Sequence, residues 1–573
     1  MMHVPNLPTL DKLNVTVPPD LDVNKVAAQW MASFSFAVEA GNVGGIMSLF
    51  IDESHWRDML ALTWDFRTFN GAASIQQFLA DRLVPAHLSH FRINDEYTAL
   101  LRPYPDIAWI HVLFDFETQL GLASGIVRLV PQAQGPWKAH CMYTNLEDLK
   151  GFPEKIGGLR NPAPNHGEWA HEREHAVAFE DEEPTVLVIG AGHSGLDVAA
   201  RLKCLGVRAL VVERNPRIGD NWRNRYEALC LHDPVWYDHL PYMPFPPTWP
   251  VYTPALKLGN WLEHYAEALE LDVWTSSNVV SARKNQSGSW DVVVDRAGKE
   301  RVFTVKHLIF ATGIGGGEAK FPAYPGMDVF KGQILHSIEH KRADDHMGKK
   351  VVVVGSCTSA HDLAADYYNH GIDVTMYQRS STYIMSTKSI LKHIMGDNYK
   401  EGGPPVGIAD RVTASFPHLM AIGLGRRQAL EIAEDDKEIL DGLRKRGFKL
   451  NMGTMDAGFP LSAWHRAGGY YLDVGASQMI IDGKIKLKND SQLAEFTPSG
   501  LKFEDGSELP ADVVVFATGL GDARNTCKQI WGLDEEGEIH GSWRDIGVPG
   551  LWYMMEIKAM EEGLFGARYS AAK

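Results

Sequence analysis

The feature that most constrains this chain of 573 residues is a glycine-rich turn between an apolar run and a helical pattern. In TVLVIGAGHSGLDVAARLKCLGVRALVVER (185–214), the apolar run ends directly in Gly190, Gly192 and Gly195, and a second apolar run ends on Glu213. The first glycine of such a turn permits a tight bend, the second lets the backbone approach a pyrophosphate, and the third lets helix and strand pack closely. The segment therefore predicts a βαβ unit that binds a dinucleotide.

Two further features of this unit favour a bound dinucleotide. The helix that begins at the turn presents free N–H groups and a partial positive charge to phosphates. Glu213 follows the first glycine by 23 residues, where a carboxylate can accept hydrogen bonds from a ribose diol. The residues expected to contact this first cofactor are Gly190, Gly192, His193, Ser194, Gly195, Glu213 and Arg214.

A second unit, KVVVVGSCTSAHDLAADYYNHGIDVTMYQRS (350–380), repeats this order with small residues in place of the second and third glycines. Its second apolar run ends on Gln378, Arg379 and Ser380 rather than on an acid. An acid there would repel a 2′-phosphate, whereas arginine can pair with one and serine can donate to it. The unit is therefore expected to prefer NADPH over NADH; an exposed arginine with no ligand is the alternative. The expected contacts are Gly355, Ser356, Thr358, Ser359, Ala360, Arg379 and Ser380.

One site that ends in glutamate and one that ends in arginine together suggest FAD in the first unit and NADPH in the second. A flavin can accept hydride from NADPH and pass electrons onward singly or in pairs. Two repeats, LIFATG (308–313) and VVVFATG (513–519), each predict a strand that runs into a small-residue turn. Such a turn lets the chain cross closely over a dinucleotide or pass between domains, so Thr312 is expected to contact FAD.

The region before residue 160 has a different pattern. A helical pattern lies within 23–50, and the runs 107–118, 121–131 and 137–149 predict long antiparallel strands. Helices followed by a curved sheet indicate an α+β domain. The element order and the closing MYTNLEDLKG resemble the cone-shaped nuclear-transport-factor or SnoaL-like fold. This domain could shield an active site, mediate a homodimer or bind a ligand of its own.

Composition limits the partners and the cellular location that the protein is expected to have. A formal charge of -16 argues against a nucleic-acid or anionic-membrane partner, since both need a basic face. No stretch approaches the ~20 apolar residues that a membrane helix needs, and the N-terminus lacks the pattern of a secretory signal. The five cysteines show no redox or zinc spacing, which favours the cytosol. A His/Glu cluster in 161–183 is interpreted as a solvated linker, so no metal is expected.

From about residue 184 onward the chain resembles the class B flavoprotein monooxygenases. This group contains the flavin-containing monooxygenases, the plant YUCCA-like enzymes and the Baeyer–Villiger monooxygenases. The resemblance rests on GAGHSG, RIGDNWRNRYEALCLHDP (217–234), FPAYPGMDVFKGQILHSIEH (321–340), GSCTSA and the two ATG turns.

The segment FKGQILHSIEHK (330–341) matches the linker signature of this group through Phe330, Gly332 and His336, in the pattern F-x-G-x-x-x-H. The Baeyer–Villiger branch continues into a tryptophan where this chain has His340. The difference favours the flavin-containing monooxygenase or YUCCA-like branch.

The resemblance implies an FAD- and NADPH-dependent monooxygenase. One oxygen atom of O2 would reach a small organic substrate, an N- or S-nucleophile or a 2-oxo acid, through a flavin hydroperoxide. It implies that His336 couples the positions of the two nucleotide domains, that Trp222 contacts FAD, and that Arg225 and His232 act beside the flavin. An uncoupled NADPH oxidase and a catalytically weakened flavin-fold binding protein remain alternatives.

Two further segments bear on function. PYMPFPPTWPVYTP (241–254) is rich in proline and aromatic residues, and fits either a substrate-side wall or a rigid surface loop. After PGLWY (549–553), Met554 and Met555 lead at once into EIKAMEEGLFGARY, where the family has a turn and a helix start at the flavin. Loss of those N–H donors would weaken FAD binding or turnover.

The expected fold class is α/β, with two Rossmann-like dinucleotide-binding domains preceded by an α+β cone-like domain. The expected domains are 1–160 (SnoaL-like cone domain), 161–183 (linker), 184–335 (FAD-binding domain, first part), 336–475 (NADPH-binding domain) and 476–573 (FAD-binding domain, second part, shortened at its C-terminus).

Overall fold

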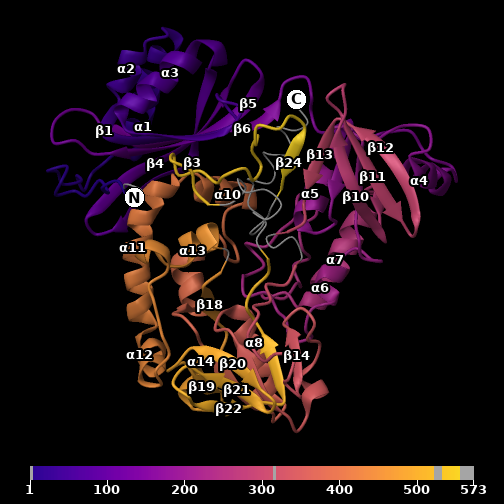
Figure 1. The fold of residues 1–573 in the computed structure, drawn as a ribbon. Coiled ribbons are helices and arrows are strands. Elements are labelled where there is room, and N and C mark those ends of the chain that lie inside the picture. Colours follow the sequence, from indigo (N-terminus) through magenta and orange to yellow (C-terminus); the bar gives the residue numbers. More distant parts are fainter. Residues whose placement is uncertain (1–3, 314–317, 467, 522–531, 555–573) are drawn as a thin grey trace.

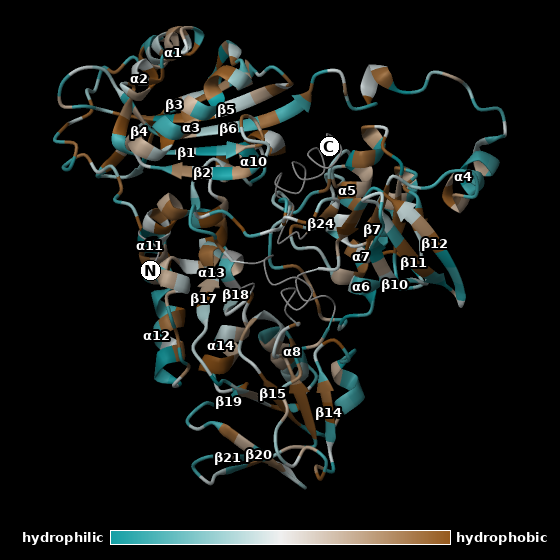
Figure 2. Cartoon of the chain, turned by 45° about the horizontal axis from the view of Figure 1, so that its top comes forward, coloured by the Kyte–Doolittle hydropathy of each residue, from teal (hydrophilic) through white to brown (hydrophobic). Residues whose placement is uncertain are grey.

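The computed structural model describes residues 4–313, 318–466, 468–521 and 532–554, and it contains three parts (Figure 1). An N-terminal domain lies beside two units that are each built on a five-stranded parallel sheet. The expected α/β class with two dinucleotide-type units is confirmed. Figure 2 shows apolar residues concentrated on strands such as β14 and β15, inside the second unit.

The N-terminal domain packs three helices on one six-stranded sheet. Its sheet runs in the order β2-β1-β6-β5-β4-β3, in which β1 and β6 are parallel and the other neighbours antiparallel. Trp30 and Phe34 of the first helix are buried against Trp56 of the sheet, which fixes the helix layer by aromatic packing. The elements are α1 (Val23–Glu39), α2 (Val43–Met47), β1 (Phe50–Met59), β2 (Phe66–Asn70), α3 (Ala72–Ala86), β3 (Ser89–Tyr104), β4 (Ile107–Glu117), β5 (Gly121–Val130) and β6 (Lys138–Leu149).

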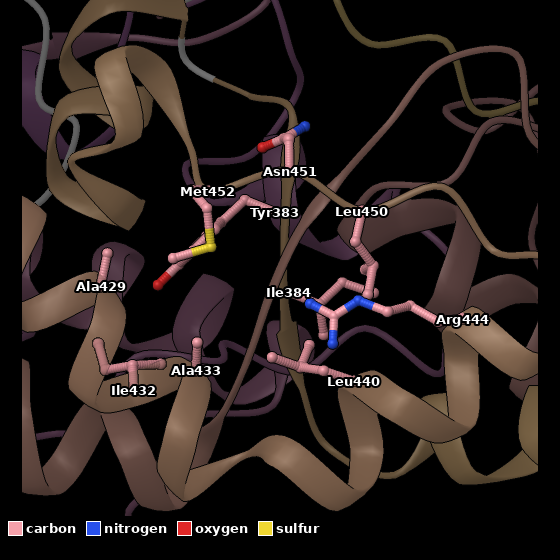
Figure 3. A pocket seen from close by; sticks show the side chains of 10 residues that line it. All are labelled: Tyr383, Ile384, Ala429, Ile432, Ala433, Leu440, Arg444, Leu450, Asn451 and Met452. Atoms are coloured by element: carbon pink, nitrogen blue, oxygen red, sulfur yellow. The ribbon is translucent and has the colours of Figure 1, made fainter.

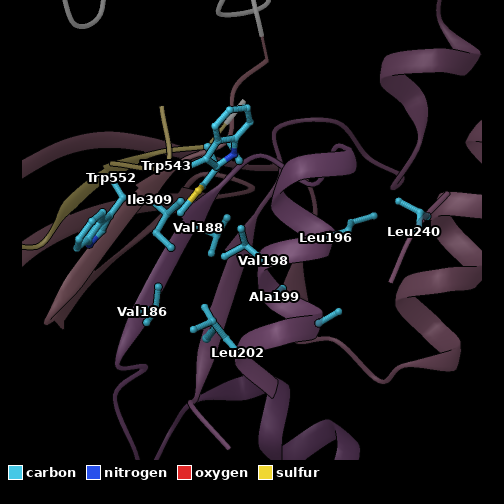
Figure 4. Close-up of a cluster of buried hydrophobic side chains, with 14 of the residues drawn as sticks. Val186, Val188, Leu196, Val198, Ala199, Leu202, Leu240, Ile309, Trp543 and Trp552 are labelled. Atoms are coloured by element: carbon cyan, nitrogen blue, oxygen red, sulfur yellow. The ribbon is translucent and has the colours of Figure 1, made fainter. Parts of the chain in front are cut away.

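The first nucleotide unit has the sheet order β24-β13-β7-β8-β9. Figure 4 shows its core, in which Val186 and Val188 of the central strand pack against Leu196, Ala199 and other residues of the helix that follows. The elements are η1 (Gly157–Leu159), α4 (Trp169–Ala178), β7 (Val186–Ile189), α5 (His193–Cys204), β8 (Ala209–Val212), α6 (Asp220–Arg223), α7 (Ala255–Ala268), β9 (Val273–Trp274), β10 (Ser277–Lys284), β11 (Trp290–Arg296), β12 (Lys299–Val305), β13 (His307–Phe310) and β24 (Leu551–Tyr553).

The second nucleotide unit has the sheet order β14-β23-β15-β16-β19. Its elements are β14 (Gln333–His336), η2 (Ala343–His346), β15 (Lys350–Val354), α8 (Thr358–Asn369), β16 (Asp373–Tyr377), α14 (Ala476–Ile481), β19 (Lys486–Lys488), β20 (Leu493–Thr497), β21 (Gly500–Phe503), β22 (Glu508–Pro510) and β23 (Val513–Phe516).

A helical insertion lies between two strands of this unit, β17 and β18, which pair in parallel. It contains α9, η3 and α10 to α13, and α11 reaches from the second unit toward the N-terminal domain (Figure 1). The elements are β17 (Tyr383–Ser386), α9 (Thr387–Ser389), the π-helix η3 (Ile390–Met395), α10 (Val406–Ala414), α11 (His418–Asp435), α12 (Lys437–Lys445), η4 (Thr454–Asp456), α13 (Gly458–Arg466) and β18 (Tyr470–Asp473).

Two expected segment assignments differ from the observed topology. The range 161–183, expected as a linker, contains α4, and Arg173 of this helix pairs with Asp272 of the first unit at 2.8 Å. The range 476–573, expected to return to the first unit, supplies β19 and β23 to the second sheet before β24 joins the first. The reason is that the apolar β23 pairs with β14 on one side and β15 on the other, which places it inside the second sheet.

Charged side chains attach the N-terminal domain to the helical insertion. Glu147 of β6 accepts two hydrogen bonds of 2.6 Å from Arg411 of α10. The buried Arg128 of β5 donates to the Ser415 hydroxyl at 2.7 Å, and its guanidinium lies 3.6 Å from the ring centre of Phe416. A buried cation needs such partners, so these contacts fix where the sheet of the N-terminal domain rests on the rest of the chain.

Candidate functional site

The first glycine turn is shaped by the chain that crosses it. Gly190 has φ +108°, and a Cβ there would lie 2.5 Å from the carbonyl oxygen of Ala311. A Cβ on Gly195 would lie 1.9 Å from the Gly190 carbonyl oxygen. A Cβ on Gly192, in contrast, would have Asn221 as its nearest neighbour, at 3.7 Å. Packing therefore requires the first and third glycines, while the second faces open space that a ligand could fill.

Glu213 lies beside this turn, as the sequence indicates. Its Oε2 accepts from the Ala191 N–H at 2.9 Å and its Oε1 from the Asn215 N–H at 2.8 Å. Oε1 also accepts from the Asn215 side-chain amide at 2.8 Å, so Oε2, with one hydrogen bond, is the oxygen that retains acceptor capacity for a ribose hydroxyl. The N-cap of α5 is Gly192, without a side-chain cap, which leaves N–H groups of the first turn for phosphates. These donors and acceptors fit the pyrophosphate and ribose of FAD.

His193 and Trp222 form a pair at the start of α5. The Trp222 indole N–H donates to His193 Nε2 at 3.2 Å, and the rings stack with centres 5.5 Å apart. Burial lowers the pKa of His193 to about 4, so the ring is neutral and can accept this bond. The pair thus positions the first turn of α5. Arg214 is exposed and Thr312 is half-buried at the crossing strand's end.

The second turn repeats the first crossing. Gly355 has φ +140°, and a Cβ there would lie 2.4 Å from the carbonyl oxygen of Ala517. Ser356 shares a hydrogen bond of 2.8 Å with the Thr382 hydroxyl, and Thr358 donates to the Tyr470 carbonyl at 3.4 Å. Both hydroxyls therefore hold the segments around β17 and β18 against the turn. Ser359 and Ala360 follow in the first turn of α8, which has no side-chain cap.

Arg379 and Ser380 are exposed beyond the end of β16. Within the described part of the chain, no hydrogen bond or ion pair of the Arg379 guanidinium is found. Gln378 has a different role: it is buried, donates to the Lys449 carbonyl at 2.8 Å and accepts from the Lys449 N–H at 2.8 Å. A fixed strand end that carries an exposed cation fits a 2′-phosphate.

His336 and Arg225 come from different parts of the sequence and interact electrostatically. His336 ends β14 and is fully buried, and its Nδ1 accepts from the Ile338 N–H at 3.3 Å. Burial lowers the pKa of His336, against smaller opposite effects of the Gly519 main chain and Glu339, and the nearby Arg225 charge adds the smallest lowering effect. Among the described residues, His336 Nε2 and Arg225 Nε are buried without a hydrogen-bond partner. Buried polar atoms are rarely left without a hydrogen bond, so these two nitrogens are candidates to bind a polar ligand.

His232, expected to act beside the flavin, contacts residues of the second unit through both ring nitrogens. Its Nδ1 is 2.8 Å from the Leu472 carbonyl oxygen, and its Nε2 is 3.1 Å from Asp362 of α8. Tyr226 donates to the same carboxylate at 2.9 Å. Burial lowers the pKa of His232, but the hydrogen bond and charge of Asp362 outweigh it, and the net pKa is raised. Both ring nitrogens are used in joining the first unit to the second.

His340, at the position where the Baeyer–Villiger branch is expected to have tryptophan, forms polar contacts in the protein interior. It is buried, and its Nδ1 is 3.2 Å from the Tyr367 hydroxyl. The same hydroxyl is 2.7 Å from His346, whose other nitrogen is 3.1 Å from Gln333. This chain of polar contacts ties the linker after β14 to α8.

A cavity of about 310 Å³ lies where the N-terminal domain, the helical insertion and a loop of the first unit meet. Its lining is mostly apolar or aromatic, which suits a small organic molecule. The lining residues are Arg57, Tyr237, Ile394, Met395, Asn398, Tyr399, Thr413, Ala414, Phe416, His418, Ala421, Ile422, Leu424, Gly425, Gln428, Ala457, Phe459, Pro460, Leu461 and Ala463.

The aromatic loop 241–254 does not line this cavity. Phe245 stacks on Trp249 at 4.7 Å, and both rings pack on Trp261 of α7, so the loop is a rigid part of the first unit. The wall residue is Tyr237, shortly before the loop. Tyr237 and Arg57 were not expected from the sequence: β1 also carries Asp52, Glu53 and Asp58, so its local pattern does not single out Arg57.

Two other hollows are less suited to a substrate. The one between α11, α12 and β17 (Figure 3) has about 10 Å³, which is room for a single water molecule. A wider hollow of about 480 Å³ borders Lys155, Cys204 and Leu271, at the end of α5 opposite the glycine turn.

Further expectations from the sequence concern the C-terminal segment, metal binding and membrane spans. Residues 555–573, which carry the departure from the family pattern after Met554, lie outside the described residues. Within the described chain, no group of three or more His, Cys, Asp or Glu side chains could hold a metal ion. No described helix is both long and apolar enough to cross a membrane.

Comparisons with known proteins place these features in context. Residues 236–393 match the family model described as flavin-binding monooxygenase-like. Indole-3-pyruvate monooxygenase YUCCA1 of Oryza sativa subsp. japonica is 30% identical over 346 residues, 59% of this chain and 76% of that protein. Probable indole-3-pyruvate monooxygenase YUCCA3 of Arabidopsis thaliana is 31% identical over 399 residues, 67% of this chain and 84% of that protein.

Similar folds occur among solved structures. A flavin-containing monooxygenase from Stenotrophomonas maltophilia has a TM-score of 0.45 at 19% identity, with 68% of this chain and 96% of that chain covered. A closed crystal structure of cyclohexanone monooxygenase has a TM-score of 0.49 at 16% identity, with 68% and 83% covered.

The contrast between two glycines of the first turn is testable. Gly192→Ala should leave the fold intact, because its Cβ meets only Asn221, but should weaken FAD binding about 10- to 100-fold by blocking backbone contacts to phosphate. Gly195→Ala should instead destabilise the apoprotein. Flavin titration and thermal melting of both apoproteins check this; unchanged FAD affinity in Gly192→Ala would contradict it.

The contact between His232 and Asp362 predicts a pH dependence. Because the folded pKa of His232 is raised above 6.5, its stabilisation is complete below pH 6.5 and is lost as pH rises through the folded pKa. Asp362→Asn should therefore cost about 1.5–3 kcal/mol at low pH and progressively less at high pH. Melting curves from mild acid to mild base measure the difference.

The matched control is Asp181→Asn, which removes the partner of the exposed His175. An exposed pair contributes about 0–1 kcal/mol, so this variant should melt almost like the wild type throughout. A cost of Asp362→Asn that grows with pH would show that the carboxylate does not stabilise an imidazolium.

Proposed function

Because the chain belongs to the flavin-binding monooxygenase-like family, we propose that it is an FAD- and NADPH-dependent monooxygenase of small organic substrates. The overall reaction consumes substrate, O2, NADPH and H⁺ and yields the oxygenated substrate, NADP⁺ and water. The observation that carries the proposal is the pair of equivalent glycine turns, together with two buried nitrogen atoms, His336 Nε2 and Arg225 Nε, that have no hydrogen-bond partner among the described residues.

The residues of the first turn would hold FAD. Gly192 leaves room for the pyrophosphate, the first N–H groups of α5 donate to it, and Glu213 accepts from the ribose. The pair of His193 and Trp222 fixes the start of that helix. FAD, when bound, supplies the transfer of electrons from nicotinamide to oxygen.

The second turn would hold NADPH, with Arg379 and Ser380 at the 2′-phosphate. His336 would donate from Nε2 to a cofactor oxygen, because its Nδ1 already accepts a main-chain hydrogen bond. Arg225 adds a fixed cation that attracts the nucleotide phosphates. The contact of His232 with Asp362 would keep the two turns at a constant spacing.

The cavity of 310 Å³ would take the substrate. YUCCA relatives are named indole-3-pyruvate monooxygenases, and the proposal therefore covers N- or S-nucleophiles and 2-oxo acids. We also propose that residues 1–160 form a SnoaL-like cone domain, supported by the order of its helices and its mixed sheet. A cytoplasmic location and a homodimer formed through this domain are further proposals, the first supported by the cysteine pattern.

Oxygen-18 labelling tests the proposed reaction. The protein, saturated with FAD and NADPH, is supplied with oxygen-18 gas and a panel of sulfides, amines and 2-oxo acids. Mass spectrometry should find one labelled oxygen atom in a product. Consumption of NADPH with peroxide as the sole product would favour the uncoupled oxidase, and absence of FAD binding would favour a binding protein.

The exposed cation of the second unit gives a separate prediction. Arg379→Ala should raise the KM for NADPH about 10- to 100-fold, because a charge-assisted hydrogen bond to the 2′-phosphate is lost. The KM for NADH, which has no such phosphate, should stay the same and serves as the internal control. Equal effects on both coenzymes in steady-state assays would remove Arg379 from the coenzyme site.

A further inference from the structure

The N-terminal domain takes part in the substrate cavity, in addition to resting on the helical insertion. Among the described lining residues, Arg57 of β1 comes from this domain, and others, such as Phe459, come from α13. Its side chain is 2% exposed. A domain that precedes both nucleotide units in the chain thus contributes directly to the walls around the proposed substrate.

The charge of Arg57 is matched within the protein. Its Nε donates to Glu538 Oε1 at 2.7 Å and its Nη2 to Glu538 Oε2 at 2.8 Å, a two-pronged pair in which both side chains are 2% exposed. Thr68 donates to the same carboxylate at 2.5 Å. Burial raises the pKa of Glu538, but Arg57 outweighs it and lowers the pKa to about 2, so the carboxylate is ionised.

Two other polar side chains of the wall, His418 and Tyr399, form hydrogen bonds within the protein. His418 Nδ1 is 2.7 Å from the Gly537 carbonyl oxygen, and burial with the Arg57 charge lowers the pKa of His418 to about 4, so this ring is neutral. Tyr399 donates to the buried Asp410 at 2.7 Å. The remaining polar side chains of the lining, such as Gln428 and Asn398, are uncharged. Among the described residues that line the cavity there is therefore one buried cation, Arg57, and its counterion is Glu538.

We propose that Arg57 is a specificity-determining residue and that its pairing with Glu538 makes the cavity select uncharged, apolar or aromatic substrates over carboxylates. The inference rests on the proposed function and narrows its substrate class. A carboxylate that entered would lose its hydration without gaining a free cation, which is strongly unfavourable in an apolar site. An uncharged ring of matching volume would lose little and would bury apolar surface.

Two sulfides that share a reacting atom test this selection. Thioanisole is uncharged, and 4-(methylthio)benzoate adds a carboxylate at the far side of the ring. With the protein saturated in FAD and NADPH, kcat/KM for sulfoxide formation should favour thioanisole by at least about tenfold. Equal rates, or a preference for the carboxylate, would overturn the proposal.

Glu538→Gln should reverse the preference, because it removes the carboxylate charge that pairs with the Arg57 guanidinium at the cavity wall. The ratio of kcat/KM for the carboxylate to that for thioanisole should rise at least about tenfold. The control is Glu536→Gln on the same segment: its partner Arg67 is 37% exposed, and neither residue lines the cavity. An unchanged ratio in Glu538→Gln, or the same change in both variants, would contradict the role of Arg57.

The double variant Arg57→Met with Glu538→Gln removes both charges, and it should lack the gain toward the carboxylate. A gain in the double variant equal to that in Glu538→Gln would overturn the proposal, because the cation would be unnecessary. If Glu538→Gln does not fold, the double variant is compared with the wild type: a ratio for the carboxylate raised about tenfold above the wild-type ratio would overturn the proposal.

Saturation-transfer NMR shows which of the two sulfides binds more tightly, without any turnover. If the proposed function is wrong but the inference is right, thioanisole should still bind more tightly and no sulfoxide should form. If the inference is wrong but the proposed function is right, both compounds should give sulfoxide without a preference for thioanisole.

Discussion

Two chain crossings set the geometry on which the rest of the structure depends. The carbonyl of Ala311 occupies the space where a side chain on Gly190 would lie, and the carbonyl of Ala517 has the same relation to Gly355. Each crossing strand, β13 or β23, pairs in parallel with the strand that leads into the turn. Every nucleotide turn is therefore bounded by a second strand end. Because β14 also pairs with β23, its terminal His336 comes close to the second ATG turn.

The N-terminal domain is attached to the same framework through charge. Besides the contact of Arg57 with Glu538, Arg67 pairs with Glu536 at 2.6 Å and Arg544 with Asp65 at 3.0 Å. Glu536, Glu538 and Arg544 lie on the segment 532–544, which precedes the return of the chain to β24. Buried ion pairs add little net stability because of their desolvation cost, but they penalise any arrangement that separates them. The domain thus specifies the position of one cavity wall.

Local patterns in the sequence were sufficient for the nucleotide units, whereas long-range contacts were not. The strands 186–189 and 209–212 have the bounds that their apolar runs predict, and Glu213 lies at the turn because its spacing is set within one βαβ unit. The contact of Arg57 with Glu538 joins residues 481 positions apart, and no local pattern encodes it. The partner of His232, Asp362, also lies in the other unit, so no local pattern encodes this contact either.

The most direct measurement of the central claim is an anaerobic titration of the purified, FAD-saturated protein with NADPH. Two nucleotide turns that hold FAD and NADPH against each other require that equimolar NADPH bleach the visible flavin absorbance, and that admission of air restore it. NADH should bleach it more slowly at the same concentration, because it cannot pair with Arg379. A flavin that stays oxidised in the presence of excess NADPH would contradict the assignment of the two units.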